Sequence, residues 1–254
     1  MRITAVFSGA VHIVYGIYVW LVLLIVMIPV AIGLALIPGV LRRRQIARWG
    51  ARSIFLLIGS RIRMSGKRVP EFETCVVVAN HSSYLDGIIL TAALPARFTF
   101  LVKQEMSAFP VAGFVLKRLG SEFVNREDAR HRHRAARRLL DAAAEGTPLA
   151  FFPEGTFDVN PGLKPFQLGA FRAAWRADLP MLPVAIKGAR HKLPSGALLL
   201  RPGPISVRIT KLLAPHDYEG PQTLMHGARR SILQHLDEPD LQIDAEPEPA
   251  REDS

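Results

Sequence analysis

The sequence predicts an α/β protein whose mostly parallel sheet is flanked by helices and preceded by an N-terminal membrane-embedded helical segment. Residues 3–41 contain no aspartate, glutamate, lysine or arginine. After residue 70, short apolar runs alternate with stretches of helical length, a pattern typical of βα units around a parallel sheet. The chain has 254 residues, of which 49% are hydrophobic and 21% charged, so it is long enough for one sizeable core.

The first element, residues 1–41, is predicted to be a membrane anchor. Roughly 20 apolar residues cross a bilayer core, so this segment is longer than one helix needs and too short for two full spans. Pro29, Gly33 and Pro38 are places where a helix can kink or end, which leaves a single crossing and a bent hairpin in one leaflet both open. The length of the apolar stretch argues against a third interpretation, a cleaved signal peptide.

A cluster of arginines directly follows this segment, at Arg42, Arg43, Arg44, Arg48 and Arg52. By the positive-inside rule, the cluster places the following domain on the cytoplasmic side of the membrane. The net charge is +10, and residues 237–254 hold eight acidic side chains and one arginine, so the rest of the chain carries +17. Such a body suits anionic lipid headgroups or nucleic acid, and charge alone does not choose between them.

Residues 42–236 are predicted to form one α/β domain, and residues 237–254 an acidic, disordered tail that the chemistry does not need. The predicted strands are the short apolar runs Thr74–Ala79, Phe98–Val102, Ser121–Val124, Pro148–Phe152, Leu182–Ile186 and Ile205–Ile209. The predicted helices are Leu85–Ala93, Val111–Leu119, Asp128–Glu145, Gln167–Ala177 and Leu224–Leu236. Cys75 is the only cysteine, which excludes an internal disulfide and a cysteine-rich zinc site.

Polar side chains follow the first four predicted strands. Residues 80–86 read Asn-His-Ser-Ser-Tyr-Leu-Asp, and the next three strands lead into Lys103, Arg126 and Glu154. In an open α/β sheet the ligand crevice lies beyond the carboxyl ends of the strands. We therefore expect a base, an acid and two cations to converge there.

His81 and Asp86 are the candidate catalytic pair. A neutral imidazole can accept a proton from an alcohol, and a carboxylate can hold the imidazole in the required tautomer. A spacing of five residues allows this contact if His81 lies in the loop and Asp86 in the first turn of the following helix, with a serine at position 82 or 83 as the helix cap. The alternative is that residues 80–86 are only a capped helix start.

The other candidates are suited to binding a polar ligand. The guanidinium of Arg126 can bind a phosphate bidentately, and Lys103 can add a point charge, although surface ion pairs are the alternative for both. Glu154 stands before Gly155, where the glycine lets the backbone approach a ligand and the carboxylate can accept a hydrogen bond from a hydroxyl group. An exposed acid in a turn is the alternative for Glu154.

Four spaced blocks of this sequence resemble the 1-acylglycerol-3-phosphate acyltransferase family, the glycerolipid acyltransferases with an H-x4-D box. The blocks occur in the family's order at residues 80–86, 120–126, 152–156 and 182–185, and the resemblance covers residues 70–215. It implies that His81 is the general base and Asp86 its partner. It also implies that Arg126, Glu154, Gly155 and Thr156 bind the acceptor, and that residues 42–236 form the acyltransferase domain.

The resemblance implies transfer of an acyl group from coenzyme A or acyl carrier protein to a lysophospholipid hydroxyl in the membrane. Lysophosphatidic acid, converted to phosphatidic acid, is the first expectation for the acceptor. Neither a bound cofactor nor a metal is expected. One departure weakens phosphate recognition, because Phe157 and Asp158 stand where the family often has Arg-Ser. Lys164 can compensate for the missing cation, or the acceptor can carry another headgroup.

Two other classes of function remain open. A basic, membrane-tethered binding module would recruit nucleic acid or another anionic partner. Nucleic-acid modules usually interleave aromatic residues with their cations, whereas the cations here cluster behind the anchor and in one helix. A lysophospholipase would release free fatty acid from the same lipids. The sequence has no G-x-S-x-G motif, the usual signature of a serine hydrolase with an acyl-enzyme intermediate.

Overall fold

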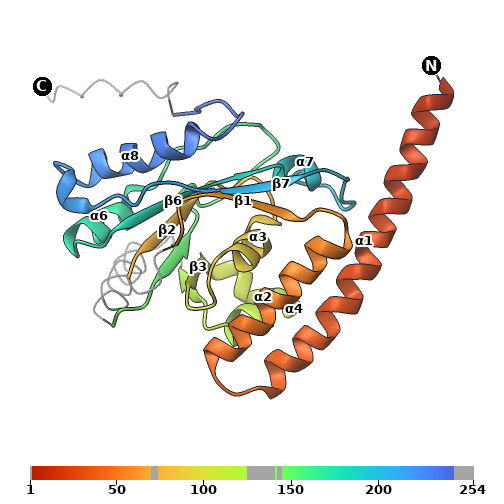
Figure 1. The fold of residues 1–254 in the computed structure, drawn as a ribbon, viewed down its shortest axis with the longest axis horizontal. Coiled ribbons are helices and arrows are strands. Elements are labelled where there is room, and N and C mark those ends of the chain that lie inside the picture. The colour runs from red at the N-terminus through yellow and green to blue at the C-terminus, as the bar shows by residue number, and fades with distance from the viewer. Residues whose placement is uncertain (1, 70–73, 125–140, 142–144, 243–254) are drawn as a thin grey trace, which may run out of the picture.

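A computed structural model of the chain describes residues 2–69, 74–124, 141 and 145–242 (Figure 1). Seven strands of these residues form one sheet in the order β1-β7-β6-β2-β5-β3-β4. The strands are β1 (Ile62–Gly66), β2 (Val76–Ala79), β3 (Thr99–Lys103), β4 (Glu122–Val124), β5 (Leu149–Phe151), β6 (Met181–Lys187) and β7 (Ile205–Ile209). The β6–β7 pair is antiparallel and the other neighbouring pairs are parallel, which confirms the predicted, mostly parallel α/β sheet.

Each of the six predicted strands occurs, with boundaries shifted by up to two residues. The strand that the sequence did not predict is β1, at one edge of the sheet. Four of its five residues are exposed, so it lacks the apolar run by which the buried strands are recognised. It pairs in parallel with β7, which brings Ile62 opposite Ile205.

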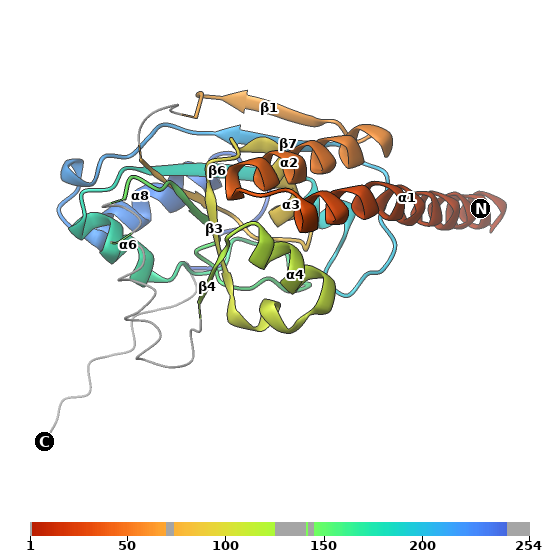
Figure 2. The ribbon, with the colours of Figure 1, turned by 90° about the horizontal axis from the view of Figure 1, so that it is seen from below.

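Helices cover both faces of the sheet (Figures 1 and 2). The helices are α1 (Arg2–Leu36), α2 (Val40–Leu57), α3 (Asp86–Ala93), α4 (Pro110–Arg118), α6 (Leu168–Arg176), α7 (Ala189–Lys192) and α8 (Pro221–Leu233), with 3-10 turns η1 (Gln104–Ala108) and η2 (Pro215–Asp217). Alternate residues of β2 face opposite sides: Val77 packs in the core with α2 and α3, whereas Val78 packs in the core with α6 and α8. The predicted helix Asp128–Glu145 lies almost wholly outside the described residues.

Helix α1 is the long apolar helix that the N-terminal segment predicts. Its residues Val11–Leu36 are the one stretch of the described chain that is long and apolar enough to cross a membrane. The helix runs through Pro29 and Gly33 and ends two residues before Pro38. Its N-terminal end extends beyond the rest of the molecule (Figures 1 and 2).

The same helix also packs against the α/β domain. Val19 of α1 is fully buried in the core that α2 and α3 share. Tyr15 Oη donates to the carbonyl oxygen of Ile58 at 2.9 Å, and Trp20 Nε1 donates to that of Leu198 at 3.0 Å. The segment is therefore attached to the domain along part of its length and leaves an apolar face exposed.

Part of the arginine cluster after α1 has a structural use that the sequence did not reveal. The residues form helix α2, and Arg44 donates to the carbonyl oxygens of Leu119 at 2.8 Å and Arg97 at 3.0 Å. From α4, Arg118 donates to the carbonyl oxygens of Leu34 and Ala35, both at 2.6 Å. A guanidinium at the C-terminal end of a helix satisfies its free carbonyls and interacts favourably with its dipole, so Arg118 stabilises the end of α1.

The segment expected to be a disordered tail begins with residues that have defined contacts. Glu238 accepts hydrogen bonds from Arg190, and Asp240 accepts them from Arg229. Acidic residues and prolines predict disorder because they bury little apolar surface, but here charged partners on the domain hold residues 237–242 in place. Residues 243–254 lie outside the described part of the chain.

Candidate active site

The site begins where β2 ends, between its neighbours β5 and β6. Asn80 follows the last residue of β2 and is buried. Its side-chain amide donates to the carbonyl oxygen of Ile186 at 3.0 Å and its side-chain oxygen accepts from the backbone N–H of Ile186 at 2.7 Å. This pair of hydrogen bonds continues the contact between β2 and β6 by one residue and fixes the start of the loop that carries His81.

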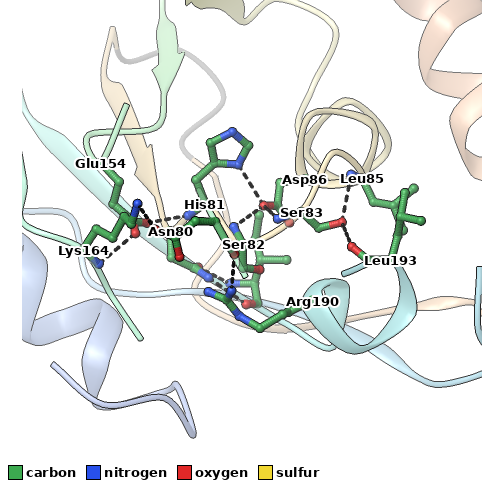
Figure 3. Close-up of polar contacts among 12 residues, drawn as sticks. Asn80, His81, Ser82, Ser83, Leu85, Asp86, Glu154, Lys164, Arg190 and Leu193 are labelled. Atoms are coloured by element: carbon green, nitrogen blue, oxygen red, sulfur yellow. Dashed lines mark hydrogen bonds and ion pairs between the residues drawn. The ribbon is translucent and has the colours of Figure 1, made fainter. Parts of the chain in front are cut away.

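His81 and Asp86 lie together as the sequence predicted (Figure 3). His81 is in the loop and Asp86 is the first residue of α3. The distance between His81 Nδ1 and Asp86 Oδ2 is 2.9 Å. The Asp86 side chain is 0% exposed and that of His81 is 18% exposed, so the pair has a buried acid and an accessible imidazole.

Asp86 also fixes the backbone of the loop. Its Oδ2 accepts the backbone N–H of Ser82 at 2.6 Å and that of Ser83 at 2.8 Å. Three donors therefore converge on one carboxylate oxygen, which orients both the imidazole and the loop. The predicted serine cap is only approximated. The cap position of α3 is Leu85, whose backbone N–H donates to Ser83 Oγ at 3.2 Å, while the Ser83 hydroxyl donates to Leu193 O at 2.8 Å.

Aromatic rings surround the imidazole of His81. Phe152 stacks on it with a centroid distance of 4.2 Å, and Phe157 meets it edge-on at 4.5 Å. Tyr84 in turn packs on Phe157 at 4.7 Å. These contacts leave the imidazole few orientations besides the one in which Nδ1 faces Asp86, so Nε2 is held on the opposite edge of the ring.

Glu154 lies beside the pair but has a role that the sequence did not predict (Figure 3). It is 5% exposed, so it is not the exposed turn acid that was the alternative. Its Oε1 accepts the backbone N–H of His81 at 2.5 Å and its Oε2 accepts that of Lys164 at 2.9 Å. The carboxylate thus joins two loops, and Gly155 after it has φ +78, a left-handed conformation that favours glycine.

Burial sets the electrostatics of this carboxylate. It raises the pKa of Glu154 to about 7, against the lowering effect of the two backbone N–H donors from His81 and Lys164. No sequence signal predicts the contact, because Glu154 and His81 are 73 residues apart. In the structure the carboxylate holds the loop of His81, and the acceptor binding suggested by its position after a strand stays a prediction.

The predicted cations have acidic partners. Lys164 Nζ pairs with the carboxylate of Asp158, and this hydrogen bond lowers the pKa of Asp158. Lys103, at the carboxyl end of β3, pairs with Glu105 at 3.3 Å, and both side chains are about half exposed. Thr156 is exposed in the loop after Gly155. Arg126 lies outside the described residues, so its predicted place near the site stays a prediction.

This geometry supports one type of chemistry. With Nδ1–H donated to Asp86, the tautomer has Nε2 free to accept a proton. The buried carboxylate stabilises the imidazolium that then forms. The site can therefore take a proton from a hydroxyl group that reaches the accessible edge of the imidazole.

The comparisons with known proteins agree with the resemblance in the motifs. The family model described as "Acyltransferase" matches residues 61–187, half of the chain. A 1-acyl-sn-glycerol-3-phosphate acyltransferase from Chlamydomonas reinhardtii is 32% identical over 168 residues, which are 66% of this chain and 50% of that protein. A lyso-ornithine lipid O-acyltransferase from Pseudomonas aeruginosa is 32% identical over 152 residues, 60% of this chain and 57% of that protein.

A solved structure shares the fold. The crystal structure of the 1-acyl-sn-glycerophosphate acyltransferase PlsC from Thermotoga maritima has a TM-score of 0.74 and 19% identity, and the match covers 95% of this chain and 98% of that one. The chain spans about half the length of the first curated relatives it matches. The family resemblance read from the four motif blocks is confirmed, and the chain belongs to the acyltransferase family.

Proposed function

We propose that this protein transfers a fatty acyl group from a thioester to a free hydroxyl of a lysophospholipid, with His81 as general base. The observation that carries the proposal is the hydrogen bond of 2.9 Å between His81 Nδ1 and the buried Asp86, beyond the carboxyl end of β2. Membership in the acyltransferase family indicates that the reaction is acyl transfer.

In the proposed mechanism His81 Nε2 accepts the proton of the acceptor hydroxyl as its oxygen attacks the thioester carbonyl. The new ester C–O bond forms, the C–S bond breaks, and the leaving thiolate takes up the proton from the His81 imidazolium, which returns to the neutral imidazole. No covalent acyl-enzyme forms. Asp86 keeps Nδ1 protonated and stabilises the imidazolium. The acyl donor is a cosubstrate, an acyl thioester of coenzyme A or of acyl carrier protein, and no resident cofactor is needed.

Lysophosphatidic acid is the first candidate for the acceptor, with Arg126 and Lys103 on its phosphate and the loop from Glu154 to Lys164 on its glycerol. Another lysolipid headgroup is the second candidate, and two observations favour it. Asp158 occupies a position where the family often has a serine, and it pairs with Lys164, which removes a free cation from the loop. A lyso-ornithine lipid O-acyltransferase is also among the relatives.

We propose that α1 embeds the enzyme in the membrane, so that the lysolipid reaches the site from the bilayer. Its apolar stretch Val11–Leu36 supports this attachment. The arginine cluster that follows α1 favours a catalytic domain on the cytoplasmic side. Cysteines introduced at Ser8 and Ser53 distinguish a single crossing from attachment to one leaflet. Labelling from opposite sides of the membrane indicates a crossing, and labelling from the same side indicates attachment to one leaflet.

The test is product analysis with purified protein in lipid micelles. A radiolabelled acyl thioester of coenzyme A, or of acyl carrier protein, is offered with lysophosphatidate, lysophosphatidylethanolamine or lyso-ornithine lipid. A labelled diacyl product supports transfer, and the best acceptor identifies the headgroup. Free fatty acid as the main product would favour a lysophospholipase. Salt-dependent binding of duplex DNA without either product would favour the binding module.

A further inference from the structure

We infer that Arg229 and the segment 237–241 position His81 for catalysis by holding the loop on which Glu154 depends. We call residues 237–241 the C-terminal clasp. This inference rests on the proposed role of His81 as general base. It assigns Arg229 as a positioning residue, because its contacts reach the imidazole only through other residues.

The clasp binds the loop that follows Glu154 through its backbone. The backbone N–H of Leu163 donates to Pro239 O at 2.8 Å, and the backbone N–H of Leu241 donates to Leu163 O at 3.1 Å. Leu163 and Asp240 thereby form a parallel bridge. The side chain of Leu241 covers Gly162, where an added Cβ would lie 2.5 Å from Leu241 Cγ. The clasp therefore fits closely against residues 162–163.

Arg229 of α8 secures the same place from inside. Its side chain is 3% exposed and its Nε donates to Asp240 Oδ1 at 3.0 Å. Its Nη2 donates to Leu163 O at 2.6 Å and its Nη1 donates to Lys164 O. A buried guanidinium requires an acidic partner, and the clasp residue Asp240 supplies it. Without the clasp, Arg229 would lose the charge that allows it to stay buried beside the loop.

A continuous series of contacts connects Arg229 to His81. Arg229 holds the carbonyl of Lys164, and the N–H of Lys164 donates to Glu154 Oε2 at 2.9 Å. Glu154 Oε1 accepts the N–H of His81 at 2.5 Å (Figure 3). Movement of Lys164 would therefore remove one of the two partners of Glu154 and loosen the backbone from which the imidazole extends.

A second ion pair attaches the clasp on its other side. Arg190, after β6, donates from Nε to Glu238 Oε1 at 2.9 Å and from Nη2 to Glu238 Oε2 at 3.0 Å. The same guanidinium donates from Nη1 to the carbonyl oxygen of Asp158 at 2.9 Å, and Glu238 accepts the N–H of Gly162 at 3.0 Å. The clasp thus holds one end of the loop directly, and Arg190, which pairs with Glu238 of the clasp, holds the other end at Asp158.

The experiment compares two truncations of the full chain. Ending the chain after Leu236 removes the clasp, whereas ending it after Gln242 removes only residues beyond the clasp and is the matched control. We expect the first truncation to lower kcat at least tenfold, and by on the order of a hundredfold if the loop shifts by about 1 Å. The KM for the acceptor should rise as well, because the proposed function places this loop on the acceptor's glycerol, whereas the KM for the acyl thioester should change by less than about threefold. The control should match wild type.

Point variants keep the test decisive if the shorter chain does not fold. Asp240→Asn keeps the shape of the clasp but removes the charge that pairs with Arg229, and it should lower kcat in the same direction. Arg229→Lys should retain more activity than Arg229→Met, because a cation remains beside the loop. Thermal unfolding of each variant identifies any loss of folded protein.

The pH profile separates positioning from a merely structural role. Glu154 faces the backbone N–H groups of His81 and Lys164, the carboxylate of Asp86 and the guanidinium of Arg229. Removal of the cation in Arg229→Met favours protonated Glu154, which loses acceptor capacity, so the acid limb of the kcat profile should move to higher pH. A purely structural role would lower the amount of folded enzyme without moving that limb.

The outcomes distinguish this inference from the function on which it rests. If wild type is active and the truncation after Leu236, Asp240→Asn and Arg229→Met all retain wild-type kcat and acid limb, the clasp does not position His81 and the inference is wrong. If wild type transfers no acyl group, or His81→Ala is as fast as wild type, the proposed function itself has failed.

Discussion

Replacement of Asp86 by asparagine tests the charge of the proposed dyad with little change in shape. All three donors to this side chain converge on Oδ2, namely His81 Nδ1 and the N–H groups of Ser82 and Ser83. An asparagine with its oxygen in that place keeps these three hydrogen bonds and loses only the negative charge. The effect on the rate therefore reports how much the carboxylate stabilises the imidazolium.

The structure gives the magnitude. An imidazolium and a carboxylate about 4 Å apart attract each other by about 4 kcal/mol at an effective dielectric constant of about 20. Loss of this attraction in the transition state should lower kcat/KM on the order of a thousandfold. Among the described residues Asp86 Oδ1 has no hydrogen-bond partner, so the new amide nitrogen is an unsatisfied buried donor that costs about 1–3 kcal/mol of stability.

The assay is acyl transfer by wild type, Asp86→Asn and Asp217→Asn, with thermal unfolding of each. Asp217 is exposed in η2 and serves as the control for loss of one carboxylate. In the background of His81→Ala, Asp86→Asn should have little further effect, because the two residues act as a unit. A folded Asp86→Asn enzyme with kcat/KM within about fivefold of wild type would refute the reasoning.

Three further predictions follow from particular contacts. Burial raises the pKa of Glu154 from 4.5 to about 7, so the folded protein binds the proton of this carboxyl group more tightly than the unfolded protein does. The free energy of unfolding therefore falls as the pH rises between these two values. The stability of Glu154→Gln relative to wild type, measured by urea unfolding, should thus rise by about 2.5 kcal/mol between about pH 5 and pH 8, and a difference that falls or stays constant would contradict the burial effect. Gly188 has φ +87, and an added Cβ would lie 2.2 Å from the carbonyl oxygen of Pro204, so Gly188→Ala should cost about 2–4 kcal/mol. Gly196→Ala, at φ +78 with open space around it, should cost only about 1–2 kcal/mol. Equal losses of unfolding free energy for the two variants, measured in urea, would show that the contact with Pro204 O contributes nothing. Phe157→Ala removes the edge contact with the imidazole and should lower kcat/KM by roughly twofold to tenfold, whereas a faster enzyme would mean that the ring obstructs the site.

The fold could be predicted from the sequence where strands are buried on both faces. In β2, Val76, Val77 and Val78 are all buried, because helices cover both sides of the sheet, and such strands appear as apolar runs. The edge strand β1 has no such run, and its pairing with β7 depends on residues about 140 positions away. Helix α2 was not predicted, because the sequence of this segment is dominated by arginines. The acceptors of Arg44 and Arg52 lie on other elements of the fold.

The site was predictable where its residues are close together in the sequence. His81 and Asp86 are five residues apart, so a loop followed by a helix start is enough to bring them together. Glu154 is different, since its partners His81 and Lys164 lie on separate loops and its burial follows only from the assembled fold. A carboxylate that joins two loops and one that binds a ligand have the same local sequence.

The same limit applies to the C-terminal clasp. Its acids and prolines are the composition of a disordered segment, and the opposite charges that hold it are Arg190 and Arg229 on distant elements. No feature of the sequence distinguishes Arg229 from the other cations of the chain, yet its side chain is buried and donates to Asp240, Leu163 and Lys164.

The most direct measurement for the central claim is acyl transfer by purified wild type and His81→Ala, assayed in parallel with a labelled acyl thioester and with lysophosphatidate and lysophosphatidylethanolamine as acceptors. We predict that wild type forms the diacyl product with at least one acceptor and that His81→Ala forms it more slowly by on the order of a hundredfold or more. A folded His81→Ala enzyme as fast as wild type would contradict the assignment of His81 as general base.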